Sequence, residues 1–180
     1  MPKIEIVYYS GTGNTAQLAE LVAQSSGGRL WALENDGMSP KGMWEALDAA
    51  DTILFGSPTY MGGPAWQFKR FADATGARWD KRTWQDKLAG GFTTSGSTVG
   101  DKGECMSYFI TLGNQHGMIW ISLGQSSPPS RDNPQTATNW SGGNGGVMAI
   151  AGRDGMPEGD LQSARDYGAR VLELTQKFAR

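Results

Sequence analysis

The sequence has little of what metal-based or covalent chemistry uses. Cys105 and His116 are the one cysteine and the one histidine in 180 residues, which excludes an internal disulfide and zinc sites built from spaced cysteines and histidines. Sixteen basic residues balance eighteen acidic ones without a run of like charge, so we expect no nucleic-acid partner. The apolar run near Ile4 carries Glu5 and soon ends, so we expect neither a signal peptide nor a membrane span. These features predict a single domain over residues 1–180, in the cytoplasm and without a bound metal.

Glycine, in contrast, is abundant. The chain has 26 glycines, or about 14%, roughly twice the usual frequency. Glycine permits tight turns and lets the backbone approach a ligand closely, so the excess of glycine indicates a ligand-binding site. Several of these glycines fall in three short loops, whereas Gly142, Gly143, Gly145 and Gly146 have no evident place.

Short apolar runs alternate with segments of helical periodicity along the whole chain. This alternation is typical of a parallel sheet with crossover helices, and it predicts an α/β fold. We expect a doubly wound five-stranded parallel sheet with helices on both faces. The expected strands are residues 3–9, 29–34, 52–56, 88–94 and 118–123, with a short further piece at 147–151. The expected helices follow residues 10–15, span 41–50, start at Pro64, span 102–115, and run from near Pro157 to the C-terminus.

In such a sheet, ligands bind beyond the carboxyl ends of the strands where the strand order reverses. The first loop there, residues 10–15, offers glycines, hydroxyls and a helix start, all suited to a phosphate, but no lysine as in a Walker A motif. Residues 11–16 also fit the dinucleotide motif G-x-G-x-x-A, with Glu34 about 20 residues further on. The hydroxyls of Ser10, Thr12 and Thr15 favour a phosphate monoester, and NAD binding is the alternative.

Two further loops are expected at the same edge. Residues 57–64 contain two prolines, an aromatic and two glycines, which suits contact with a flat ring and its polar edge. Residues 93–100 form a second surface rich in hydroxyls and glycine. Either loop alone is typical of a solvated turn, but three such loops at one edge predict a binding site.

At this point the sequence resembles the flavodoxin-like flavoproteins. The opening YYSGTGNT (residues 8–15) is similar to the FMN-phosphate loop of flavodoxins generally. Within that group, residues 57–64, 75–96, 114–118 and 148–155 resemble the WrbA-type NAD(P)H:quinone oxidoreductases. The resemblance covers nearly the whole chain and implies a flavodoxin-like fold.

The resemblance also implies the roles of individual residues. The FMN phosphate would be held by Ser10, Gly11, Thr12, Gly13, Asn14 and Thr15. The isoalloxazine edge would be contacted by Pro58, Thr59, Tyr60, Met61 and Gly62, and a second flavin loop by Thr94, Ser95, Gly96, Ser97, Thr98 and Val99. His116 matches a histidine beside the flavin with a catalytic role, and Trp79 matches an aromatic used against the substrate.

The implied function is an FMN-dependent NAD(P)H:quinone oxidoreductase with ping-pong kinetics. NAD(P)H would pass a hydride to flavin N5 and leave, and a quinone would then take two electrons at the same site. The resemblance also implies a homo-dimer or homo-tetramer. The alternatives are a flavodoxin-type one-electron carrier and a flavin-bound regulatory protein. An electron carrier is expected to have a strongly acidic surface that steers it to its protein partner, and a net charge of −2 supplies little of one. We therefore favour the enzyme.

Some residues have a second interpretation, and some stretches differ from the family that the sequence resembles. His116 precedes Gly117 and also suits the C-terminal end of a helix. Cys105 is expected to be a buried apolar side chain. WrbA-type proteins carry an aromatic where this chain has Gly11 and Thr12, which affects the nicotinamide site. Residues 124–146 are rich in Pro, Ser, Asn and Gly, and within them residues 124–144, with Trp140 as a candidate for ring stacking, are expected to form a changed substrate pocket or a subunit contact.

Overall fold

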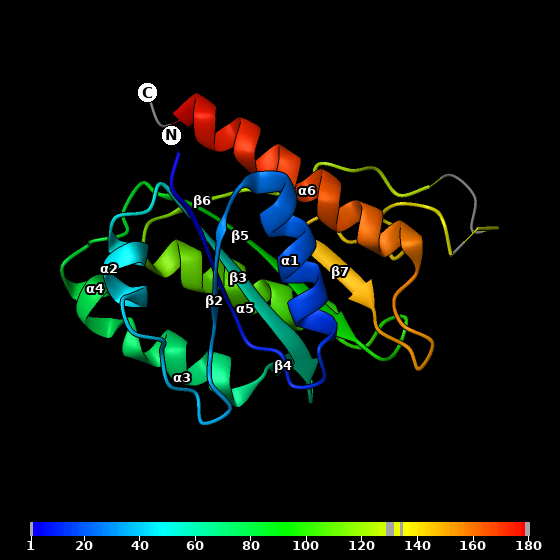
Figure 1. Ribbon diagram of the computed structural model, residues 1–180, viewed down its shortest axis with the longest axis horizontal. Coiled ribbons are helices and arrows are strands. Elements are labelled where there is room, and N and C mark those ends of the chain that lie inside the picture. Colours follow the sequence, from blue (N-terminus) through cyan, green and yellow to red (C-terminus); the bar gives the residue numbers. More distant parts are fainter. Residues whose placement is uncertain (1, 129–131, 134, 179–180) are drawn as a thin grey trace.

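A computed structural model describes residues 2–128, 132–133 and 135–178 (Figure 1). Five sheet positions follow the order β2-β1-β3-β5-β6, and neighbouring strands pair in parallel. The order reverses between β1 and β3, as in flavodoxin-like sheets, so the predicted doubly wound fold is confirmed. The strands are β1 (Ile4–Tyr8), β2 (Arg29–Ala32), β3 (Thr52–Tyr60), β5 (Leu88–Ser95) and β6 (Ile119–Trp120).

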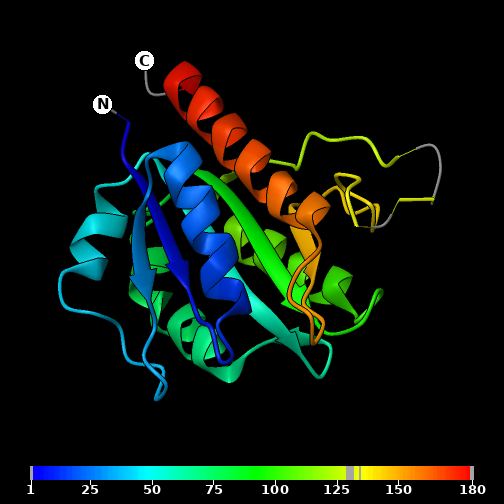
Figure 2. The same ribbon diagram turned by 45° about the vertical axis from the view of Figure 1, so that its right-hand side comes forward.

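Helices cover both faces of the sheet (Figures 1 and 2). On one face, α1 (Asn14–Ser26) lies beside α6 (Glu158–Phe178). The other face carries α2 (Met43–Asp48), α3 (Trp66–Ala74), α4 (Gly76–Asp80) and α5 (Lys102–Gln115). Among the described residues, no helix combines the length and apolar character needed to cross a bilayer.

The central strands are buried on both sides. All five residues of β1 are buried, and its side chains alternate between two cores. Ile6 packs in the core under α1 and α6 together with Tyr167, whereas Val7 packs in the opposite core together with Phe55 and Phe109. A strand covered by helices on both faces needs an unbroken apolar run, which is why β1 was predictable.

The fifth sheet position is built from two separate pieces. β6 pairs with the start of β5 at Leu88 and Ala89, and β7 (Val147–Ile150) pairs with its end, from Phe92 to Ser95. Between these pieces the chain leaves the sheet after Trp120 and rejoins it at Val147. The expected strand 118–123 is therefore shorter than predicted, and the short piece near residue 147 completes the same position. With β7 and the two-residue β4 (Gly63–Pro64), the sheet has seven strands instead of five.

The connection after β3 is a hairpin instead of a direct turn into a helix. β3 continues to Tyr60 and pairs antiparallel with β4. Met61 and Gly62 link the two strands with φ of 49° and 80°, as a tight hairpin turn requires. Pro64 therefore lies in β4, and the expectation that it begins a helix is wrong, because α3 begins at Trp66.

Candidate functional site

The three predicted loops meet at the carboxyl edge of the sheet, where β1, β3 and β5 end (Figure 1). The hydroxyls of Thr15 and Thr94 lie 3.0 Å apart and join the first loop to the third. Those of Thr59 and Thr93 lie 2.8 Å apart and join the second loop to β5. The structure thus assembles residues from distant parts of the sequence into one surface.

The first loop leaves backbone donors open at the start of α1. Gly13, the N-cap residue, has a φ of 93° and no side chain to cap the helix. Ser10 Oγ accepts hydrogen bonds from the N–H groups of Gly13 and Ala16, at 3.2 and 3.1 Å. The N–H groups of Asn14 and Thr15 donate to no residue that the structure describes. Open N–H groups beside hydroxyls at a helix start fit a phosphate monoester.

The second loop reaches the first through Tyr60. A Cβ placed on Gly11 would lie 2.5 Å from Tyr60 Oη, so a larger residue at position 11 would displace the tyrosine. Burial raises the pKa of Tyr60, and the nearby Tyr9 raises it further. Tyr60 thus contacts the stretch in which the resemblance implied an aromatic residue, while Met61 extends fully into solvent.

The third loop is organised by a residue that the sequence analysis missed. Lys102 lies at the first position of α5 and is only 2% exposed. Its Nζ donates to Ser95 Oγ at 2.9 Å and to the carbonyl oxygens of Ser97, Thr98 and Val99 at 2.8, 2.8 and 3.1 Å. Burial lowers the pKa of Lys102. A cation in the first turn opposes the helix dipole, and this local conflict was the available signal in the sequence.

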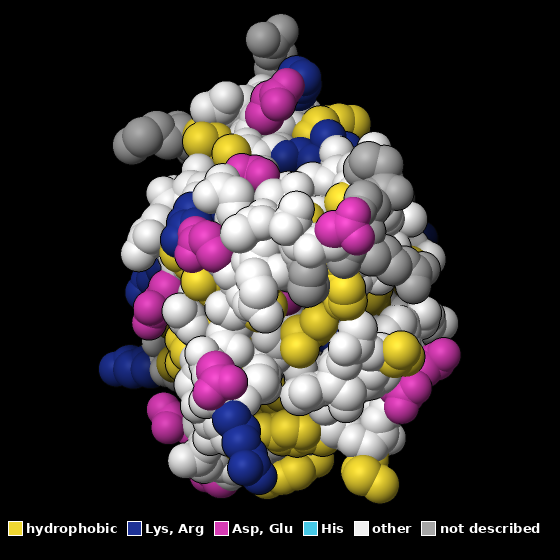
Figure 3. Space-filling model, turned by 90° about the vertical axis from the view of Figure 1, so that its right-hand side faces the viewer, with side chains coloured by type: hydrophobic (Ala, Val, Ile, Leu, Met, Phe, Trp, Pro, Cys, Tyr) yellow, Lys and Arg dark blue, Asp and Glu magenta, His cyan; other side chains and the backbone are white. Residues whose placement is uncertain are grey.

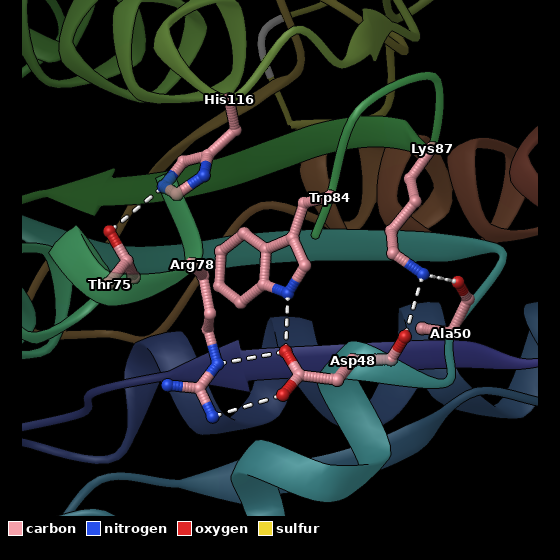
Figure 4. A network of polar contacts seen from close by, with 7 residues as sticks. All are labelled: Asp48, Ala50, Thr75, Arg78, Trp84, Lys87 and His116. Atoms are coloured by element: carbon pink, nitrogen blue, oxygen red, sulfur yellow. Dashed lines mark hydrogen bonds and ion pairs between the residues drawn. The ribbon is translucent and has the colours of Figure 1, made fainter. Parts of the chain in front are cut away.

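His116 follows the last residue of α5 and lies at the opposite edge of the sheet from the three loops, and Figure 4 shows its contact with Thr75. Since α5 starts at the carboxyl edge and returns to the start of β6, its last turn is far from the loops. His116 is 4% exposed, its Nε2 lies 2.9 Å from Thr75 Oγ1, and its ring packs on Trp84. Burial lowers the pKa of His116. The structure does not bring His116 to the flavin loops and accounts for it as a helix C-terminal residue.

Trp79 also lies at this opposite edge, on α4, and is 52% exposed. Polar contacts to Asp48 fix the helix (Figure 4). Asp48 accepts two hydrogen bonds from Arg78, at 2.8 and 3.0 Å, and one from Trp84 Nε1 at 2.8 Å. Trp79 is therefore held on a rigid helix, away from the loops of its own chain.

Residues 127–128 and 140–144 form one wall of a groove beside the third loop. The groove has a volume of about 680 Å³ and is lined by Val99, Pro128, Trp140 and Met148 among others. On this side of the molecule, hydrophobic side chains gather at the centre, with charged ones toward the margin (Figure 3). This part of the chain, where the sequence predicts a changed pocket or a subunit contact, thus lines a groove that borders the third loop.

Comparisons with known proteins agree with this geometry. Residues 28–129 match the NADPH-dependent FMN reductase family. The flavodoxin FldP of Pseudomonas aeruginosa is 40% identical over 99% of both chains, and quinone-oxidoreductase QR2 of Triphysaria versicolor is 30% identical over 98% of this chain and 96% of its own. A flavodoxin, WrbA-like protein from Agrobacterium tumefaciens has a crystal structure that matches with a TM-score of 0.82 and 42% identity, over 98% of this chain and 99% of that one. The chain therefore belongs to the family of NADPH-dependent FMN reductases, which confirms the predicted oxidoreductase class, with FMN and NAD(P)H as its ligands.

Proposed function

We propose that this protein is an FMN-dependent NAD(P)H:quinone oxidoreductase in which nucleotide and quinone use one site in turn. The meeting of three glycine- and hydroxyl-rich loops around the open start of α1 is the observation that carries the proposal. The names of two relatives, a quinone-oxidoreductase from Triphysaria versicolor and an NAD(P)H dehydrogenase (quinone) from Chromohalobacter salexigens, support the choice of quinone as acceptor.

The residues present fit FMN. The first loop would hold the phosphate through its hydroxyls and the N–H groups of Asn14 and Thr15. Residues 58–62 and 94–99 would hold the edge of the isoalloxazine. When bound, FMN supplies the two-electron redox chemistry, while the chain supplies position and electrostatics. The contact of Gly11 with Tyr60 fixes how closely the first two loops approach each other.

The proposed substrate role of Trp79 requires more than one copy of the chain. Trp79 and the three loops lie at opposite edges of one sheet, so Trp79 can reach a quinone only at the loops of another copy. Its exposed indole on a rigid helix suits such a contact. We therefore include a homo-dimer or homo-tetramer in the proposal, with Trp79 contributed across copies.

Steady-state kinetics tests the proposal. The purified protein is expected to be yellow with one FMN per chain, and to reduce benzoquinone with NADH or NADPH. Varying both substrates should give the parallel double-reciprocal lines of a ping-pong reaction. The Pseudomonas relative's name makes a one-electron carrier the second candidate. FMN without turnover, together with a stable one-electron state on titration, would establish that candidate, and a colourless protein that binds NAD would refute both.

A further inference from the structure

Lys102 is a fully buried cation that the proposed chemistry does not use. Burying an ammonium group costs several kcal/mol unless hydrogen bonds compensate it. Its place in the first turn of α5 adds an unfavourable interaction with the helix dipole. Asp160 lies close enough to Lys102 to interact electrostatically but forms no ion pair with it, and the Asp160 carboxylate accepts a hydrogen bond from the N–H of Ile150 at 2.8 Å. The compensation for Lys102 therefore comes mainly from the third loop.

The hydrogen bonds of Lys102 orient three successive peptide groups. The carbonyls of Ser97, Thr98 and Val99 all point at Nζ. The structure has no cis peptide bond among its described residues, and in a trans peptide the C=O and the following N–H point in opposite directions. The N–H groups of Thr98, Val99 and Gly100 therefore point away from the lysine.

These three N–H groups are available to a ligand. None of them donates to a residue within the described part of the chain. Successive N–H groups directed to one side make a concave site for an anion or a carbonyl oxygen. Gly100 closes the turn with a φ of 54°, and a Cβ there would overlap Ser95 Oγ. The N–H groups of the loop thus face away from Lys102 only while its carbonyls accept hydrogen bonds from Lys102.

We propose that Lys102 is a positioning residue that shapes the third loop for FMN and places a buried positive charge behind it. The inference rests on the proposed function, since it takes the third loop as a flavin contact. Reduction adds negative charge to the flavin, and a cation in surroundings of low dielectric stabilises that charge more than it would in water. The charge of Lys102 should therefore increase the affinity of the protein for reduced FMN more than its affinity for oxidised FMN.

The chain contains a matched control in Lys87. Lys87 Nζ donates to the carbonyls of Asp48, at 3.0 Å, and of Ala50, at the opposite edge of the sheet (Figure 4). Burial lowers the pKa of both lysines. Replacing either one leaves part-buried carbonyls without their donor and should destabilise the fold. Only Lys102 should also affect the flavin.

The experiment compares Lys102→Met, Lys102→Gln and Lys87→Met with the wild type. FMN dissociation constants come from fluorescence titration, midpoint potentials from redox titration of the FMN-loaded proteins, and stability from urea unfolding. We expect both Lys102 variants to bind oxidised FMN about tenfold more weakly. Lys102→Gln keeps a hydrogen-bond donor but no charge, so we expect its loss of affinity for reduced FMN to be about tenfold larger than its loss for oxidised FMN. For this two-electron couple, that difference lowers the midpoint potential by about 30 mV.

Lys87→Met should lose stability but keep the wild-type FMN affinity and potential. Unchanged affinity and potential in both Lys102 variants would overturn the inference, as would an equal loss in Lys87→Met. Complete loss of FMN from Lys102→Met, with Lys87→Met still loaded, supports it. Failure of the proposed function is distinguishable, because the wild type itself would then bind no FMN.

Discussion

The hydroxyl oxygens of Thr15 and Thr94 lie 3.0 Å apart in the interior, although 79 positions separate the two residues in the chain. Thr15 belongs to the first turn of α1, and Thr94 lies near the end of β5. Both side chains are almost completely buried. Their contact fixes the distance between the proposed phosphate loop and the third loop.

A double-mutant cycle on this pair should show coupling. Thr15→Val and Thr94→Val each leave one buried hydroxyl without a partner, which costs about 1 to 3 kcal/mol of unfolding free energy. The double variant removes both hydroxyls, so its loss should be smaller than the sum of the single losses. Urea unfolding measures all four proteins, and strictly additive losses would show that the contact is not formed.

Gly11→Ala should weaken FMN binding. The new Cβ would lie 2.5 Å from Tyr60 Oη and push the second loop from its place. Overpacking of this kind costs about 1 kcal/mol or more, or roughly fivefold in the dissociation constant. Tyr60→Phe removes the clashing oxygen, so Gly11→Ala should cost less in that background. Gly63→Ala is the control, because no atom lies within 4 Å of its Cβ.

Trp79→Ala should impair quinone reduction and leave FMN retention intact. An aromatic contact contributes about 0.5 to 1.5 kcal/mol, so kcat/KM for benzoquinone should fall up to about tenfold. Trp66→Ala replaces another exposed tryptophan and serves as the control. Light scattering of the same samples gives the oligomeric state. A monomeric wild type, or unaltered quinone kinetics in Trp79→Ala, would remove Trp79 from the site.

The stability of the protein should depend on pH through His116. Burial lowers the folded-state pKa of His116 below its usual value of 6.5. As the pH falls below about 6.5, the unfolded chain takes up a proton that the folded chain does not, so the free energy of unfolding decreases. The slope has an upper limit of about 1.4 kcal/mol per pH unit and ends at the folded-state pKa.

His116→Gln should remove this part of the pH dependence, because glutamine does not titrate. Urea unfolding at pH values from 7.5 down to about 5 compares the two proteins. Equal slopes would mean that the protonated imidazole is accepted in the folded state. FMN binding should be unaffected, since the imidazole of His116 lies at the edge opposite to the three loops and, unlike Trp79, is buried within its own chain.

The sheet and the site edge were predictable from the sequence because they follow general rules. β1 and β5 are apolar runs buried on both faces, and loops after such strands meet at one edge. The motif alone carries no information about which edge of the sheet His116 reaches, but the expected elements do, because a helix over 102–115 between two parallel strands ends at the edge opposite to the three loops. The topology of α5, which returns to the opposite edge, decides that.

Contacts with backbone atoms, one set local and the other long-range, account for the other differences. Lys102 donates hydrogen bonds to the carbonyls of three successive residues, and the side chains of those residues do not indicate that their carbonyls face a lysine. Gly145 and Gly146 had no place in the sequence analysis. A Cβ on Gly145 would approach Met106, and one on Gly146 would overlap the carbonyl oxygen of Gly91. These glycines are required by neighbours more than 35 positions away.

The last position of the sheet is built from two strands, β6 and β7, and residues between them line the groove. β6 and β7 hold their own registers on β5, so the chain leaves and rejoins the sheet at two anchored points. At the second of these points Gly146 cannot carry a side chain, because its Cβ would overlap the carbonyl oxygen of Gly91. The residues that line the groove between the two anchored points can therefore differ in sequence while the pairing of β6 and β7 with β5 stays the same.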